Sequence, residues 1–246
     1  MVDGMLGVTD KRVVAIKERY SKVRDAQERW NSTAMDNRRL WAGAHYTSEQ
    51  LAVLEERGQP PIAIQITYQI VEQAIAMLTA RRPSTRALPR EDSDPKLARV
   101  WSDLFAWHWE QSDGAGEMKM AFRDHYTTGR GVILEYMDWD ADDGRGEVKF
   151  MALDPTEVYP DPASKDPLWR DAKDVFVARW MTEDKVKSLW PKKWKQIEAK
   201  GTPSEIEVNG SSVRQEHNGE YVWEGELPER DYDRKMYLVL ERFEKR

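Results

Sequence analysis

The sequence predicts an α+β protein, with a helical region over residues 1–128 followed by a β-rich region over residues 129–246. Two periodicities support this division. Before residue 129, apolar residues recur every three or four positions, as on an amphipathic helix. After it they alternate with polar residues, as on a half-buried strand. The third observation is the composition, 40% hydrophobic and 33% charged, which is typical of a globular protein and not of a disordered chain.

Three helices are predicted in the first 83 residues. The first covers residues 10–41, where charged residues separate the apolar positions. A Thr47-x-x-Gln50 capping box opens a short second helix, because each of these side chains can bond a backbone N–H that the first turn leaves without a partner. The third helix covers residues 66–78 and ends before Pro83, since proline cannot continue it.

A fourth helix is predicted to begin at Asp94 and Pro95. Aspartate is a favoured N-cap, and proline suits the first turn, where its missing N–H costs nothing. We expect Gly114 and Gly116 to end this helix. Its apolar stripe consists of Leu97, Val100, Trp101, Leu104, Phe105 and His108. A short fifth helix follows, with apolar residues Met118, Phe122 and Tyr126.

The second region begins with a predicted β-hairpin. Its strands cover residues 132–137 and 148–152, and a turn rich in Asp and Gly joins them. A stiff connection follows, because each proline in it fixes its own φ and restricts the residue before it. These prolines are Pro155, Pro160, Pro162 and Pro167.

The rest of the second region is predicted to contain two more strands and one helix. A strand covers residues 175–180, and Thr182 caps a helix that Pro191 stops. Residues 200–229 are irregular, with tight turns at Asn209-Gly210 and Asn218-Gly219. The final strand covers residues 236–243.

Charge and residue types exclude several classes of protein. The formal net charge is -6, so we do not expect the broad basic surface that grips nucleic acid. The chain has no cysteine, which excludes disulfides, thiolate zinc sites and cysteine nucleophiles. It shows no apolar signal-peptide core, and no apolar run reaches the roughly 18 residues of a membrane span. We therefore expect no membrane association.

No motif in the sequence predicts a metal or cofactor. The spacing Asp138-x-Asp140-x-Asp142 is similar to a calcium loop, but positions six and twelve are Asp143 and Lys149, where such a loop needs Gly and Glu. A solvated hairpin turn is the better interpretation. The four histidines lack metal-binding spacing, and no nucleotide-binding motif is present.

One alternative is an enzyme. Asp138 followed by Glu147-x-Lys149 matches the loose spacing of the PD-(D/E)xK nucleases, in which two carboxylates hold Mg²⁺ and the lysine helps to activate water. On a strand, Glu147 and Lys149 share one face, as that chemistry requires. The competing interpretation is a charged hairpin edge that discourages edge pairing.

Tryptophan is unusually frequent, with eleven in the chain. Large aromatic side chains are enriched in the centres of protein interfaces. Most are expected to fill the core of this chain, and some to serve subunit contacts. The candidate interface residues are Trp30, Trp41, Trp107, Trp169, Trp190 and Trp194.

Several segments, taken in order, resemble a known family. They are Arg29-Trp30 with RLWAG at 39–43, LEERGQPPIAIQITYQIVEQAIAMLTARRP at 54–83, Asp124 with Gly129-x-Gly131, Asp154-Pro155 through Asp161-Pro162, Asp171-Ala172, Met181, Pro191, and YLVLERFEKR at 237–246. In this order they resemble the N-terminal part of the portal proteins of tailed bacteriophages, of the type found in short-tailed P22-like phages. The resemblance covers roughly residues 26–246.

The resemblance implies a structural protein and not an enzyme. Portals of this family form rings, usually of twelve subunits, at one capsid vertex, and DNA passes through the channel without sequence-specific binding. The implied partners are other copies of the chain, the major capsid protein, the terminase and the head-tail adaptor or tail proteins. The implied location is the virion, assembled in the host cytoplasm.

Residues 129–246 correspond in this resemblance to the wing. The family's stem, clip and crown have no match in the chain. A non-enzymatic scaffold or adaptor domain remains a further alternative to the portal and the nuclease.

Overall fold

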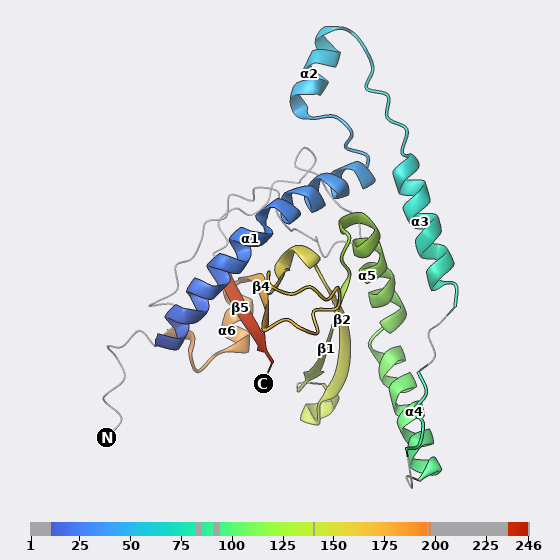
Figure 1. The fold of residues 1–246 in the computed structure, drawn as a ribbon, viewed down its shortest axis with the longest axis vertical. Coiled ribbons are helices and arrows are strands. Elements are labelled where there is room, and N and C mark those ends of the chain that lie inside the picture. The colour runs from blue at the N-terminus through green and yellow to red at the C-terminus, as the bar shows by residue number, and fades with distance from the viewer. Residues whose placement is uncertain are drawn as a thin grey trace. The chain divides into compact units, whose positions relative to one another are not determined.

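The structure is a computed structural model that describes residues 11–81, 85–90, 94–139, 141–195, 197 and 236–245 (Figure 1). Helices fill the first half and small antiparallel sheets the second, so the predicted α+β class is confirmed. The helices are α1 (Lys11–Trp41), α2 (Ser48–Glu56), α3 (Ile66–Thr79), α4 (Pro95–Gln111), α5 (Gly114–Thr128) and α6 (Glu183–Leu189). The strands are β1 (Val132–Asp138), β2 (Glu147–Leu153), β3 (Val158–Pro160), β4 (Asp174–Thr182) and β5 (Met236–Glu244).

The chain forms two compact units, which we describe one at a time. The sheet unit comprises residues 1–32 and 156–246, and the hairpin unit comprises residues 33–155. Helix α1 runs through the boundary, so its first residues belong to the sheet unit and its last to the hairpin unit. The secondary structure changes from helix to strand after Thr128. A division into domains at that point stays a prediction.

The sheet unit is built on three antiparallel strands in the order β3-β4-β5. Phe176 of β4 is fully buried and packs with Tyr20 and Val23 of α1. The rings of Tyr20 and Phe176 lie 5.8 Å apart in a tilted arrangement, which is favourable for aromatic pairs. A second cluster joins Met181, Val186 and Tyr237 and fixes α6 against the sheet.

The hairpin unit is built on the β1–β2 hairpin, with α5 and α4 packed against β2 and α3 packed against α5. Figure 1 shows α5 alongside the hairpin. Gly131 permits the close approach of the hairpin to α5, because a Cβ at this position would lie 2.2 Å from the carbonyl oxygen of Ala121. Gly129, at φ 83°, ends α5 in the left-handed conformation that glycine adopts without strain.

Most of the predicted helix ends are confirmed. Thr47 and Gln50 form the complete capping box, and Asp94 caps α4 by accepting a hydrogen bond from the backbone of Lys96. Thr182 stands at the N-cap of α6 with extended backbone, but its side chain makes no capping hydrogen bond. The two Asn-Gly turns lie outside the described residues.

The prediction that Gly114 and Gly116 end the fourth helix was wrong. Helix α4 already ends at Gln111, and both glycines belong to the first turn of α5. Asp113 is the N-cap of α5 and accepts from the backbone N–H of Gly116. A Cβ on Gly114 would lie 2.4 Å from the indole ring of Trp109, so glycine is needed there for packing and not to stop a helix.

Candidate subunit interface

Helix α4 carries its apolar stripe on the surface. None of its residues is buried, although its apolar positions follow the spacing that normally faces a core. Val100 is 61% exposed, Leu97 54% and Trp101 48%. Burying one such side chain is worth about 1.5–3 kcal/mol. A helix of this pattern therefore indicates a missing partner surface.

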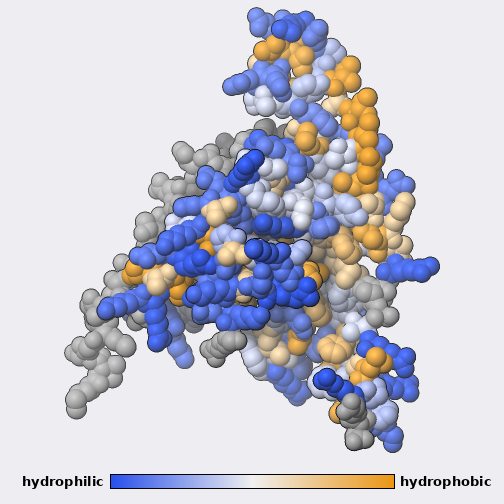
Figure 2. Space-filling view, viewed as in Figure 1, coloured by the Kyte–Doolittle hydropathy of each residue, from blue (hydrophilic) through white to orange (hydrophobic). Residues whose placement is uncertain are grey.

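Helix α3 also exposes apolar side chains. Val71 and Ile75 are buried, while Ile66, Ile70 and Met77 stay exposed. Ile62 and Ile64, in the segment before the helix, are more than 70% exposed. Figure 2 shows hydrophobic residues gathered along this segment and along α3. We call the exposed apolar residues of 62–78 and 97–107, taken together, the apolar surface. Exposed apolar patches on a protein mark interaction sites.

A buried ion cluster holds the hairpin unit together. Arg38, near the end of α1, donates from Nη1 and Nη2 to Asp154 at 3.0 and 2.8 Å, and from Nη2 to Asp124 of α5 at 3.2 Å. All three residues are at most 4% exposed. Two carboxylates and one guanidinium lose their hydration here, which is tolerable only while the hydrogen-bonded pairing stays intact.

A second ion pair fixes α3 on α5. Arg123 donates from Nε and Nη2 to the two carboxylate oxygens of Glu72 at 3.0 and 3.2 Å. The same guanidinium lies 5.5 Å from the centre of the Trp41 ring, within the range of a cation–π contact. These contacts hold α3 with its outer side exposed.

The six candidate tryptophans occupy different environments. Trp107 on α4 is 46% exposed and lies in the apolar surface, whereas Trp41 is buried against Tyr68. Trp190 and Trp194 flank the core cluster of Met181, Val186 and Tyr237. Trp30 and Trp169 are half-buried.

The list of candidates omits Trp101, which is 48% exposed on the same helix as Trp107. The stripe containing it was visible in the sequence. The exposure of that stripe was not, because the spacing alone favours a buried face.

The hairpin brings the predicted nuclease residues together. Asp138 and Glu147 are paired across β1 and β2, and Nζ of Lys149 lies 2.6 Å from Oδ2 of Asp138. This contact raises the pKa of Lys149, so the ammonium keeps its proton. The arrangement is a cross-strand ion pair, which the interpretation as a charged hairpin edge also predicts.

The Asp-rich turn and the other acidic groups give no metal centre among the described residues. No group of three or more His, Asp or Glu side chains in that part of the chain is placed to hold an ion. Asp142 and Asp143 sit in a short turn with φ of 50° and 53°, where aspartate is tolerated. Asp140 lies outside the described residues.

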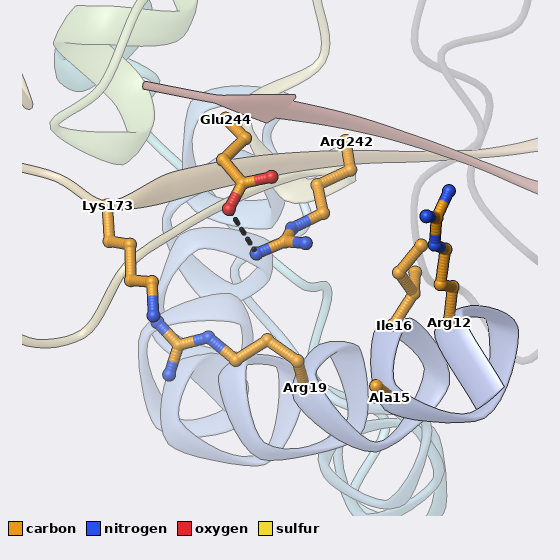
Figure 3. Close-up of a pocket in the computed structure, with 7 residues that line it drawn as sticks. All are labelled: Arg12, Ala15, Ile16, Arg19, Lys173, Arg242 and Glu244. Atoms are coloured by element: carbon orange, nitrogen blue, oxygen red, sulfur yellow. Dashed lines mark hydrogen bonds and ion pairs between the residues drawn. The ribbon is translucent and has the colours of Figure 1, made fainter. Parts of the chain in front are cut away.

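A cavity of about 560 Å³ lies in the sheet unit between α1 and the ends of β4 and β5 (Figure 3). It is lined by Arg12, Ala15, Ile16, Arg19, Lys173, Arg242 and Glu244. Asp174, whose side chain is fully buried, accepts hydrogen bonds from Arg19 and Arg242. Burial opposes the charge of Asp174, but the two arginines outweigh it and lower its pKa. The two arginines therefore link α1 to the sheet through one carboxylate.

Of the helices in the described part of the chain, none has the length and apolar character needed to cross a membrane.

Comparison with known proteins gives one family. A family model described as phage P22-like portal protein matches residues 17–246. No curated protein matches the chain. The matched range includes the apolar surface, the Arg38 cluster and the Asp154–Pro162 corner.

Proposed function

Because the chain belongs to the family of P22-like phage portal proteins, as its sequence predicted, we propose that it is a structural subunit of the portal ring at the unique capsid vertex. Membership implies a bacteriophage virion protein that associates with copies of itself and with the capsid. In our proposal the ring has twelve subunits, forms part of the conduit for genome packaging and ejection, and attaches the tail.

The observation that carries the proposal beyond family membership is the exposed stripe of α4. A subunit of a ring must bury apolar area against its neighbours, and α4 supplies it without any rearrangement of its own helix. The net charge of -6 suits a conduit, since DNA passing through it is not held by a broad basic surface.

The proposal includes the partners and the location that the family implies. The capsid shell, the terminase and the head-tail adaptor or tail proteins contact the ring in the virion or during packaging. Assembly takes place in the host cytoplasm. DNA passes through the ring without sequence-specific contacts, and the chain acts as an architectural part with no catalytic step of its own.

The test is assembly of the purified chain, followed by sedimentation velocity and negative-stain microscopy. Val100→Glu places a charge on the exposed apolar stripe of α4 and is expected to reduce the assembled fraction at least tenfold. Ala106→Glu introduces the same side chain on the opposite side of α4, at a position that is also exposed, and is expected to leave assembly unchanged. Equal assembly of the two variants would count against α4 as the interface.

The nuclease remains the alternative from another class, because Asp138, Glu147 and Lys149 do lie together on the hairpin. It predicts cleavage of DNA that depends on Mg²⁺ and disappears in Glu147→Ala. The portal proposal predicts that neither the unchanged chain nor the Glu147→Ala variant cleaves DNA. An adaptor domain, the third possibility, predicts a monomer that neither cleaves DNA nor assembles.

A further inference from the structure

The loop between β3 and β4, residues 161–173, combines an exposed apolar tip with a rigid backbone. Leu168 at the tip is 73% exposed, among the most exposed apolar side chains of the sheet unit's described residues. Pro162 and Pro167 restrict the backbone on either side.

Asp171 braces the tip from inside the loop. Its carboxylate accepts hydrogen bonds from the hydroxyl of Ser164 at 2.5 Å and from the backbone N–H groups of Lys165 and Asp166 at 2.8 and 3.3 Å. These donors favour the ionised form and lower the pKa of Asp171 to about 2. Asp166 in turn accepts from the backbone N–H of Leu168 at 3.0 Å, which fixes the tip residue itself.

The two ends of the loop are also tied. Asp161 accepts from the backbone N–H groups of Ala163 and Lys173 at 3.1 and 3.3 Å, so one side chain joins both ends. Nζ of Lys245, beyond β5, donates to the carbonyl oxygen of Arg170 at 2.8 Å. The two ends of the loop are therefore joined to each other, and Arg170 is tied to the residue that follows β5.

Trp169, next to the tip, has a φ of 55°. A bulky residue in the left-handed region is strained, and such strain persists only where surrounding contacts fix it and often where the backbone has a function. The backbone N–H of Trp169 donates to the carbonyl of Asp166, and its own carbonyl accepts from Ala172.

A rigid exposed side chain is suited to binding, because the partner does not have to order the loop. The partner must offer an apolar surface, since Leu168 has no polar group to satisfy. A closed ring is made by heterologous contacts, in which one face of each subunit meets a different face of the next. The apolar surface on the hairpin unit is one such face, and a second, different face is required.

We propose that the loop of residues 161–173 is that second face, and that Leu168 of one subunit packs on the exposed stripe of α4 of a second copy of this chain. The inference rests on the proposed ring. The contact joins Leu168, which the loop holds in a fixed position, to the apolar stripe of α4, a helix that has no buried residue. In it, Leu168 lies among Val100, Trp101, Leu104 and Phe105 of the neighbour.

The chain has no cysteine, so a disulfide can form only between thiols that are introduced. Two populations are co-expressed with different affinity tags, one carrying Leu168→Cys and the other Val100→Cys. Separate populations ensure that a mixed disulfide joins two subunits and not two positions of one chain. After mild oxidation, a species carrying both tags is expected on a non-reducing gel and is lost on reduction.

The control pairs Val100→Cys with Leu189→Cys, an exposed leucine of the sheet unit on α6. We expect the mixed disulfide of Leu168→Cys to exceed that of the control at least tenfold. If rings form without an excess of this mixed disulfide, the loop contact is wrong and the proposed ring is not contradicted. The disulfide without rings would support the contact and contradict the ring, and absence of both would overturn both.

Discussion

Replacing Arg38 by methionine tests whether the buried ion cluster holds the hairpin unit together. The change keeps much of the side-chain volume but removes the guanidinium that Asp124 and Asp154 share. Both carboxylates are at most 4% exposed, so water does not replace the lost partner without rearrangement. Breaking a buried pair in this way costs about 3–5 kcal/mol.

With a urea slope of about 2–3 kcal/mol/M, that loss lowers the midpoint of unfolding by about 1–2.5 M. The assay is urea unfolding of the purified chain, followed by tryptophan fluorescence and by circular dichroism. Arg39→Met is the matched control, because Arg39 is the next residue of α1 and is exposed. An exposed substitution of this kind changes stability by about 0.5 kcal/mol or less.

The triple variant Arg38→Met, Asp124→Leu, Asp154→Leu separates lost pairing from lost packing. It removes the two uncompensated carboxylates and is expected to recover part of the stability that Arg38→Met loses. The reasoning would be refuted if Arg38→Met and Arg39→Met unfolded at the same urea concentration.

Two further predictions concern the sheet unit. Phe176→Ala removes a fully buried ring and is expected to lower the free energy of unfolding by about 3–5 kcal/mol. Phe243→Ala on the neighbouring strand, where the ring is 46% exposed, is expected to cost far less. Equal losses of stability for the two variants in thermal unfolding would show that the core lies elsewhere. Asp171 has its pKa lowered from 3.8 to about 2 in the folded chain, so its contribution is complete above about pH 4 and is lost as pH falls toward 2. Asp171→Ala should therefore speed amide hydrogen exchange in the loop of residues 161–173 at pH 7, and at pH 2 the difference from the unchanged chain should be much smaller. An unchanged exchange rate at pH 7 would mean that Asp171 does not brace the loop.

The local structure was predictable because its signals are local. The capping box of Thr47 and Gln50, the start of α4 at Asp94 and the change of period at Gly129 each depend on residues a few positions apart. The error at Gly114 has a tertiary cause. Glycine there accommodates the ring of Trp109, and the sequence gives no sign of that contact.

The ion cluster and the interface depend on contacts between distant residues. Arg38 pairs with Asp124 and Asp154, which lie 86 and 116 positions away, and no sequence pattern near Arg38 predicts this pairing. Trp41 is buried and Trp101 exposed, although both occur on amphipathic helices, because burial depends on which helix faces receive a partner. The prolines predicted a stiff connection after the hairpin, in the segment that contains β3, but the hydrogen bonds of Asp171 and the positive φ of Trp169 emerge only from the structure.

The most direct test of the central claim is the assembly state of the purified chain at micromolar concentration, measured by sedimentation velocity and viewed by negative-stain microscopy. A ring of twelve copies of the 28.7 kDa chain has a mass of about 344 kDa and shows a central hole. The portal assignment predicts such rings and no cleavage of DNA with Mg²⁺. A 28.7 kDa monomer that cleaves DNA with Mg²⁺, and loses that activity in Glu147→Ala, would contradict it.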